Sequence, residues 1–278
     1  MSKILSMKEL VPTIFEAVVE APEIARKAKA GEFLVVMPDE KGERVPLTIA
    51  DFDREKGTIT IVFMTIGTST YKLAAMKAGD SYYAFVGPLG HASEIKNYDT
   101  VVLVAGGVGT APIYPIAREL KKAGNKVICI QGARTKDLLF WQDKIATVCD
   151  EHIITTDDGS FARKGLVTEP LKEICEREKV GIVYAIGPVP MMKFCSLTTK
   201  PFGVKTIVSL NSIMIDATGM CGGCRVNING ETKFTCVDGP EFNGHQVDWN
   251  LLTSRQRIYL AEEKCSLEKY VAEKGALK

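Results

Sequence analysis

The stretch Val101-Val-Leu-Val-Ala-Gly-Gly-Val-Gly-Thr-Ala-Pro112 joins an apolar run, a glycine-rich turn and the beginning of an amphipathic segment. The apolar run predicts a buried strand, and Pro112 suits the first turn of a helix, where its missing N–H leaves no hydrogen bond unmade. The small residues of the turn would let a pyrophosphate approach the free backbone N–H groups there. A plain turn would use the same glycines, so the motif alone leaves both interpretations open. The candidate nucleotide contacts are Gly106, Gly107, Gly109, Thr110, Ala111 and Pro112.

The segment around this motif, residues 97–210, alternates short apolar runs with amphipathic runs. Such repetition predicts a parallel sheet with helices on both of its faces. The expected strands are 101–105, 126–131, 152–155, 182–186 and 206–210, and the expected helices are 113–123, 138–149, 166–178 and 189–198.

Ligands of open parallel sheets bind at the carboxyl ends of the strands. The polar and small residues that follow the second, third and fourth strands are Arg134, Asp157, Asp158, Gly187 and Pro188. Arg134 would pair with a 2′-phosphate or stack on adenine, although a solvated loop arginine is an equally good interpretation. The acidic ribose ligand usual about 20 residues after the glycine turn is not evident, and Gln131 stands near its place.

The segments on either side have different patterns. Residues 1–96 contain short β-rich runs at 33–37, 58–63 and 81–86, separated by charged turns, which predicts a small antiparallel barrel with one helical candidate at 70–76. From residue 211 the alternation stops, and only the charged run 254–268 is typical of a helix. We therefore expect three domains, 1–96, 97–210 and 211–278.

The third segment contains a cysteine-rich loop. Asp216-Ala-Thr-Gly-Met-Cys221-Gly-Gly-Cys224, followed by Cys236, has the plant-type [2Fe–2S] spacing with Asp in place of the first Cys. Its glycines would let the loop wrap around an inorganic core, so we expect Asp216, Cys221, Cys224 and Cys236 to be cluster ligands. A Cys₃His zinc site that includes His245 is the main alternative, and buried unliganded thiols are a weaker one. The isolated cysteines, expected to be core or surface thiols, are Cys129, Cys149, Cys175, Cys195 and Cys265.

The composition excludes several other classes of protein. Of 278 residues, 35 are Lys or Arg and 34 are Asp or Glu, so a net charge of +1 gives no electrostatic case for nucleic acid or an anionic membrane. The N-terminus is charged where a secretory signal would be apolar, and no uninterrupted apolar run reaches the ~20 residues of a membrane span. We expect a cytoplasmic protein without a membrane segment.

The order of barrel, nucleotide domain and cysteine loop resembles the ferredoxin–NADP⁺ reductase superfamily. Within it, the chain is most similar to the small (alpha) subunits of NADH-dependent reduced ferredoxin:NADP⁺ oxidoreductases, also called sulfide dehydrogenase beta subunits. Matching strings span nearly the whole chain: RVPLTIAD at 44–51, GTST at 67–70, GPLG at 87–90, GGVGTAP at 106–112, GARTKDL at 132–138, TTDDGS at 155–160, KGLV at 164–167 and the loop 216–236.

The resemblance implies an FAD between the barrel and the nucleotide domain. Pro46, Leu47 and Thr48 would then line the isoalloxazine, with Thr48 reaching N5. The implied pyrophosphate contacts and further FAD-site residues are Arg44, Gly67, Ser69, Thr70, Gly87 and Gly90. An ordinary helix N-cap at Ser69 or Thr70 is the alternative for that segment.

The sequence departs from the superfamily pattern at three places. Arg44 lies one residue farther from Thr48 than in the usual motif, and Leu47 replaces an aromatic residue. Ile186 stands where many members have a cysteine beside the nicotinamide, so no thiol is expected to assist hydride transfer. The dihydroorotate dehydrogenase electron-transfer subunit has four cluster cysteines, and Asp216 stands in place of one of them. This departure argues against that subunit.

These features together predict an electron-transfer subunit. Electrons would pass between NAD(H), FAD and a [2Fe–2S] cluster, with NADP(H) as the alternative nicotinamide and no catalytic proton donor assigned. The predicted partner is a larger flavin and iron–sulfur subunit. The two subunits would form a heterodimer, an electron-bifurcating ferredoxin:NADP⁺ oxidoreductase, and ferredoxin would exchange electrons with this complex. The alternatives are a dihydroorotate dehydrogenase electron-transfer subunit, a sulfide or polysulfide reductase subunit, and a zinc-stabilised nucleotide-binding module without redox activity.

Overall fold

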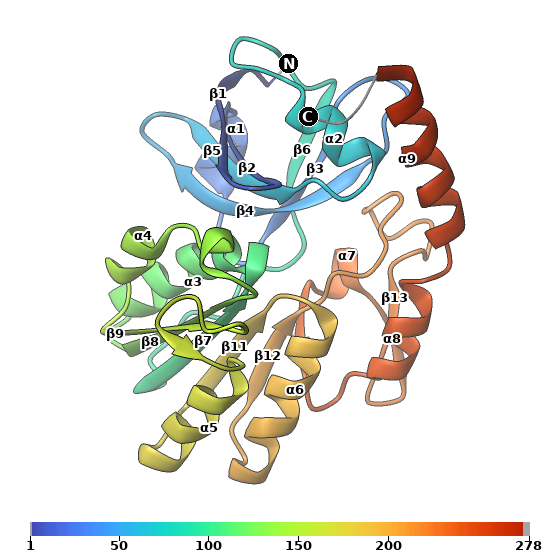
Figure 1. The fold of residues 1–278 in the computed structure, drawn as a ribbon. Helices are drawn as coiled ribbons and strands as arrows, with labels where there is room; N and C mark the ends of the chain where they lie inside the picture. Colours follow the sequence, from blue (N-terminus) through green and yellow to red (C-terminus); the bar gives the residue numbers. More distant parts are fainter. Residues whose placement is uncertain (1, 275–278) are drawn as a thin grey trace.

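The computed structural model describes residues 2–274 and begins with an antiparallel barrel (Figure 1). The segment just before β6 lies against β1 and closes the barrel. The Ile4 N–H donates to the Asp80 carbonyl, and the Gly79 N–H donates to the Ile4 carbonyl. The strands pair in the order β1-β2-β5-β4-β3-β6. They are β1 (Ile4–Val11), β2 (Ile14–Glu20), β3 (Phe33–Met37), β4 (Val45–Asp53), β5 (Thr58–Met64) and β6 (Ala84–Leu89).

Two short helices accompany the barrel where one was expected. The candidate at 70–76 is α2 (Thr68–Ala74). The unexpected helix is α1 (Pro22–Lys27), in which Pro22 occupies a first-turn position and Ile24 and Ala25 are buried against the barrel. Pro22 reads as a turn signal in sequence, but proline is equally suited to the start of a helix.

The second sheet is parallel except at one edge, and its order is β10-β9-β8-β7-β11-β12-β15. Its strands are β7 (Thr100–Gly106), β8 (Lys126–Ala133), β9 (Glu151–Thr156), β10 (Arg163–Lys164), β11 (Ile182–Ile186), β12 (Thr206–Ser209) and β15 (Glu241–Asn243). The helical segments between them are η1 (Gly107–Gly109), α3 (Thr110–Lys122), η2 (Lys136–Leu138), α4 (Gln142–Ala146), α5 (Thr168–Arg177), α6 (Val189–Thr199) and η3 (Lys200–Phe202).

Alternate side chains of β7 enter two separate cores, because successive residues of a strand point to opposite faces. Val101 and Leu103 pack with α3, whereas Val102 and Val104 pack with α5 and α6. The expected fold class, an antiparallel barrel joined to a parallel sheet covered on both faces, is confirmed.

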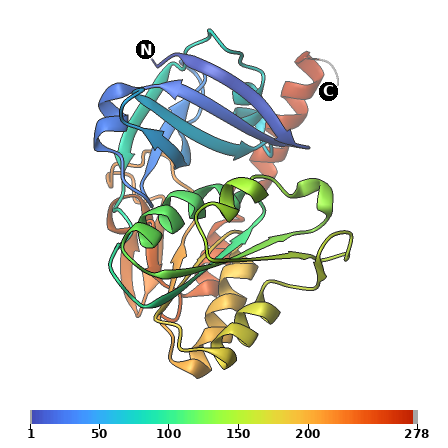
Figure 2. The ribbon, with the colours of Figure 1, turned by 90° about the vertical axis from the view of Figure 1, so that its left-hand side faces the viewer.

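The remaining elements lie beside both sheets. They are the hairpin of β13 (Arg225–Ile228) and β14 (Glu231–Phe234), then α7 (Thr235–Asp238), α8 (Trp249–Arg255) and α9 (Leu260–Lys274). The helix expected at 254–268 is thus divided between α8 and α9. Helix α9 extends from this region to the barrel (Figure 2), where the hydroxyls of Ser266 and Thr68 lie 2.9 Å apart. Since β15 also completes the second sheet, the three domain boundaries stay predictions.

A charged network fixes the barrel on the nucleotide domain. Asp51 of β4 accepts hydrogen bonds from Arg118 of α3 (2.6 Å) and Lys144 of α4 (2.9 Å). The Trp141 indole donates to Glu16 of β2 (3.0 Å), which adds a second link between the barrel and the nucleotide domain.

Over residues 2–274, no helix combines the length and the apolar character that crossing a bilayer requires.

Candidate functional site

The predicted nucleotide turn lies at the point where the strand order of the parallel sheet reverses. β7 lies between β8 and β11 in the sheet. The turns that follow β7 and β11 therefore face each other. A Cβ at Gly109 would collide with the Ile186 carbonyl oxygen, and one at Gly187 would lie 3.1 Å from the Gly106 Cα. Gly107, at φ +55°, has nothing within 4 Å of its Cβ position. The backbone at Gly107 is therefore open to a ligand, while the other glycines pack the two turns together.

Two residues in the first turn of α3, Thr110 and Ala111, have buried side chains, so only their backbone groups are available to a ligand. The side chain of Ala111 is buried beside Ala50 and Val62 of the barrel. Thr110 is also buried, and its hydroxyl lies 3.4 Å from the Gln131 amide nitrogen. Gln131, which stood near the place of a ribose ligand, is itself buried and donates to the Phe140 carbonyl (2.8 Å).

The predicted adenosine contacts come together at the ends of β8 and β9. The Asp157 N–H donates to the Ala133 carbonyl (3.1 Å), and the Asp158 N–H lies 3.3 Å from the Arg134 carbonyl. Asp158 accepts from the backbone and hydroxyl of Ser160, and these bonds lower the pKa of its carboxyl. Arg134 and Asp157 are exposed, and within residues 2–274 the Arg134 guanidinium forms no ion pair. Asp158 therefore shapes the turn, and Arg134 and Asp157 are the side chains available to a ligand.

The residues predicted to line the flavin divide between the two faces of β4. Cross-strand partners share a face of a sheet, and Pro46 is opposite Val35, which packs outside the barrel core. Leu47 is opposite Leu34 and packs with it against the barrel core. The prediction for the Leu47 side chain is therefore corrected, since strand alternation turns it away from Pro46 and its outer-face neighbour Thr48.

Gly87 and Gly90 serve packing in this structure. A Cβ at Gly87 would lie 2.7 Å from the Leu34 Cβ, in the neighbouring strand. A Cβ at Gly90, which has φ +74°, would lie 2.9 Å from both the Gly239 carbonyl oxygen and Pro240. The space beside these glycines is filled by protein, so both pack closely here, and their contact with FAD stays a prediction.

The start of α2 is capped by its own residues. Gly67 is the N-cap, and the Thr70 hydroxyl oxygen accepts from the N–H groups of Ile66 (2.9 Å) and Gly67 (3.1 Å). The Ser69 hydroxyl donates to the Glu43 carboxylate, which sequence reasoning did not connect to this site. Thr70 therefore acts as a capping residue from inside the helix, and neither it nor Ser69 is the N-cap that the alternative expected.

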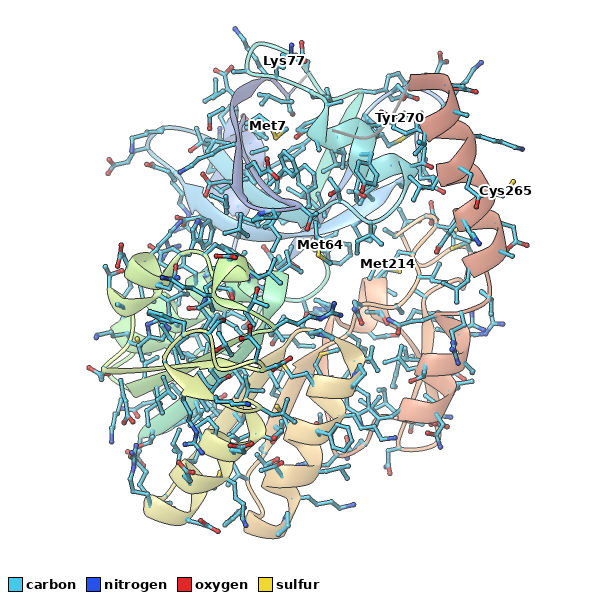
Figure 3. The ribbon with its side chains drawn as sticks, in the orientation of Figure 1. Met7, Met64, Lys77, Met214, Cys265 and Tyr270 are labelled. Atoms are coloured by element: carbon cyan, nitrogen blue, oxygen red, sulfur yellow. The ribbon has the colours of Figure 1, made fainter. Side chains whose placement is uncertain are left out.

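The cysteine loop packs on the outer face of β3. Phe33 and Val35 share a small core with Ala217, Cys224 and Cys236. Figure 3 shows Met214, which also packs there, between the barrel and α7, and Cys265 on the outer side of α9, far along the chain from the loop. The loop therefore lies against β3, the strand that pairs with the β4 residues predicted to face the flavin.

Two of the predicted ligands form a close pair. The sulfur atoms of Cys224 and Cys236 are 3.2 Å apart. Cys221 is exposed, and the backbone N–H groups of Gly223 and Asp216 lower the pKa of its thiol. The loop thus supplies three thiols, a carboxylate and inward backbone N–H groups, a donor set that fits an iron–sulfur cluster.

The zinc alternative does not fit this arrangement. A mononuclear site needs its ligands in one group, and among the described residues 2–274 no three His, Cys, Asp or Glu side chains form such a group. His245 Nε2 lies 3.0 Å from the Thr199 hydroxyl of α6. The proposed zinc ligand His245 therefore belongs to the packing of the nucleotide domain.

Arg44 contacts the cysteine loop directly. Its Nη1 lies 3.1 Å from Asp216 Oδ1, and the other carboxylate oxygen accepts from the backbone and hydroxyl of Thr218. The Thr218 hydroxyl, its backbone N–H and the Arg44 charge hold the pKa of the Asp216 carboxyl below its usual range. In this structure the partner of the Arg44 guanidinium is Asp216, and the role of Arg44 as a pyrophosphate ligand stays a prediction. No local sequence signal could have found this pair, whose members are 172 residues apart.

Comparisons with known proteins agree with this arrangement. The oxidoreductase NAD-binding domain family matches residues 103–196, and the family described as the iron–sulfur cluster binding domain of dihydroorotate dehydrogenase B matches residues 211–248. A solved structure, described as "Insights into flavin-based electron bifurcation via the NADH-dependent reduced ferredoxin-NADP oxidoreductase structure", is similar with a TM-score of 0.93 at 44% identity. It covers 98% of both chains. The resemblance drawn from the sequence is confirmed.

Curated relatives match over nearly the whole length. The dihydroorotate dehydrogenase B (NAD(+)), electron transfer subunit homolog of Thermotoga maritima is 44% identical over 275 residues, covering 99% of this chain and 97% of the relative. The dihydroorotate dehydrogenase B (NAD(+)), electron transfer subunit of Desulforamulus reducens is 32% identical over 256 residues, covering 89% and 97%. The chain therefore belongs to the family of dihydroorotate dehydrogenase B electron transfer subunits, oxidoreductase subunits with an NAD-binding domain and an iron–sulfur cluster binding domain.

Proposed function

We propose that the chain carries electrons between NAD(H), FAD and a [2Fe–2S] cluster, and exchanges them with a larger flavin and iron–sulfur subunit in an electron-bifurcating ferredoxin:NADP⁺ oxidoreductase. The observation that carries the proposal is the shared core of Phe33, Val35, Cys224 and Cys236. It puts two cluster ligands against the strand that pairs with Pro46 and its flavin-facing neighbours. The electron path between the two cofactors is then short and contained within this chain.

The residues of each binding region have separate tasks. Pro46 and Thr48, on the outer face of β4, would hold one side of the isoalloxazine, and the open backbone at Gly107 would receive the dinucleotide pyrophosphate. When bound, FAD accepts a hydride as an electron pair and can release electrons singly, as the one-electron cluster requires. The tight packing of Gly106, Gly109 and Gly187 fixes the turn that orients the nicotinamide towards the barrel.

The paired arrangement of the loop supports a two-iron cluster. Cys224 and Cys236 would hold one iron, and Asp216 and Cys221 the other. The ligand spacing is that of plant-type ferredoxins with a carboxylate at the first position. A carboxylate is a harder ligand than a thiolate, so Asp216 would give this cluster a different electron affinity from that of an all-cysteine cluster.

The preferred nicotinamide is NAD(H). Arg134 shares the adenosine end with the carboxylates of Asp157 and Asp158, whereas a 2′-phosphate usually attracts several cationic donors. The neighbouring Asp157 carboxylate is exposed and would repel a 2′-phosphate. Tighter binding of NADPH than of NADH, lost on Arg134→Ala, would contradict this preference.

Exposed apolar side chains surround the cluster loop and support a partner subunit. Met220 is 87% exposed, Ile215 52% and Val237 40%. Patches of this kind mark contact surfaces, and a covered cluster would lose fewer electrons to solvent oxidants. The similar solved structure, described in terms of electron bifurcation, supports the choice of complex.

A second candidate is the electron-transfer subunit of dihydroorotate dehydrogenase B, whose name two relatives carry. Purification from the native host under anaerobic conditions, followed by flavin and iron analysis, distinguishes the candidates. We expect one FAD and two irons for this chain, and a copurifying larger subunit with flavin and iron of its own that couples NADH and ferredoxin to NADP⁺. Copurification with a dihydroorotate-oxidising subunit would favour the second candidate, and a preparation without flavin or iron would contradict both.

A further inference from the structure

Arg44 joins the barrel to the cluster loop. It lies immediately before β4, two residues from Pro46, and its guanidinium reaches Asp216 Oδ1 at 3.1 Å. The side chain of Arg44 is about half exposed, while that of Asp216 is 22% exposed. An ion pair of this exposure adds little to folding stability, so the contact calls for a role other than holding the fold.

Asp216 has a separate partner for each of its oxygens. Oδ1 faces Arg44, and Oδ2 accepts from the Thr218 backbone N–H (3.2 Å) and hydroxyl. The carboxylate is thereby fixed in orientation from both sides. The neighbouring Glu43 turns the other way, to Ser69 of α2, so adjacent residues divide their contacts between α2 and the cluster loop.

We propose that Arg44 is a positioning residue that orients the Asp216 carboxylate and raises the electron affinity of the cluster this carboxylate holds. The inference rests on the proposed function and extends it to a residue that the superfamily pattern would give to the FAD pyrophosphate. One-electron reduction adds one negative charge to the loop, and a cation beside a ligand stabilises that charge. Net charge and hydrogen bonding around the ligands are the means by which proteins adjust such clusters.

Arg44 places the positive charge of a guanidinium beside the Asp216 carboxylate. Its planar fork also gives the contact a direction that a lysine ammonium lacks. Removing the charge should therefore weaken electron uptake, and exchanging it for lysine should restore it only in part.

The test is a potentiometric titration of the purified holoprotein, monitored by electron paramagnetic resonance of the reduced cluster. In Arg44→Gln we expect the one-electron equilibrium to shift against reduction by about tenfold, which corresponds to ~59 mV. Arg44→Lys should give an intermediate shift. Arg54→Gln is the matched control, because Arg54 is also on the barrel but donates to the Ala28 carbonyl and lies over the Phe52 ring.

The route through the carboxylate is tested by combining Arg44→Gln with Asp216→Cys. Without a carboxylate oxygen to hold the guanidinium, Arg44→Gln should cause a much smaller shift than it does in the native background. If Arg44→Gln alone cannot retain a cluster, the comparison of Arg44→Lys with the native protein decides the same point.

Three outcomes separate the proposals. An unchanged potential in Arg44→Gln overturns the inference. Loss of FAD from that variant with an unchanged potential also overturns it, and returns Arg44 to the pyrophosphate. A native protein that contains no iron contradicts the proposed function itself.

Discussion

The nucleotide turn and the cluster loop are built on opposite principles. The turn at Gly106–Gly109 is held by backbone packed on backbone, so tightly that added methyl groups would meet Ile186 or Met191. The loop that contains Cys221 is exposed on one side and is held by distant residues, Arg44 and the outer face of β3. The nucleotide turn therefore has its binding conformation before the ligand arrives, whereas the cluster loop needs the bound cluster to stabilise its conformation.

The largest effect should follow loss of one cluster ligand. Cys224→Ser should reduce iron content at least about tenfold, because it removes a buried thiolate from the Cys224–Cys236 pair. The dissociation constant for NADH should stay within about twofold, because the nucleotide turn is independent of the loop. Iron analysis and NADH titration measure both, with exposed Cys265→Ser as the control. Loss of NADH binding together with iron would contradict the independence of the nucleotide turn from the cluster loop.

A methyl group in the packed turn should have the next largest effect. Gly109→Ala places a Cβ against the Ile186 carbonyl, a backbone atom that cannot move aside, and should lower the free energy of unfolding by about 3 kcal/mol or more. Gly107→Ala is the matched variant, with open space around its Cβ, and should cost about 1 kcal/mol for its positive φ. Denaturant titration compares them, and equal costs would contradict the packed turn.

A buried carboxyl in the edge strand β15 should make stability depend on pH. Glu241 of β15 accepts from the Ser93 hydroxyl (2.6 Å), and burial raises its pKa from 4.5 to about 7. The folded state then binds the proton more tightly than the unfolded state, so this contribution is full below pH 4.5 and is lost as the pH rises to about 7. The loss should be about 1–3 kcal/mol.

Glu241→Gln tests this effect of pH, since the amide cannot ionise. The difference in unfolding free energy between the native protein and the variant should depend on pH between 4.5 and about 7 and level off above it. A difference that does not change with pH would show that the region around β15 tolerates the charge.

The smallest effect is expected at the adenosine end of the nucleotide site. Arg134→Ala should weaken NADH binding less than about threefold, because an exposed guanidinium without an ion pair contributes little in water. Isothermal titration with NADH and NADPH measures it, and Arg177→Ala, in an exposed ion pair elsewhere, is the control. A loss of tenfold or more would identify Arg134 as a principal ligand.

Sequence reasoning succeeded where structure is decided locally. The β7 run, its glycine turn and α3 follow one another in the chain, and the alternation after them predicts the parallel sheet. Asp216, Cys221 and Cys224 likewise lie on one short loop because of their close spacing, and their role as cluster ligands stays a prediction. These features depend on neighbours a few residues away, which the sequence contains.

Other assignments failed where distant contacts decide. Leu47 belongs to the same matching string as Pro46, but the register of β4 against β3 turns it into the barrel core. The close packing of Gly90 against Gly239 and Pro240 also depends on residues that no local pattern connects to it. The partnership of Arg44 with Asp216 arises only when the barrel and the loop pack together.

The central claim is that one chain carries electrons from NADH through FAD to the cluster. Rapid mixing of the anaerobic holoprotein with NADH, with flavin absorbance and paramagnetic resonance followed together, tests it most directly. The account predicts bleaching of the flavin followed by the signal of a singly reduced [2Fe–2S] cluster, and in Cys224→Ser bleaching without that signal. Flavin bleaching in the native protein with the cluster left oxidised would contradict the claim.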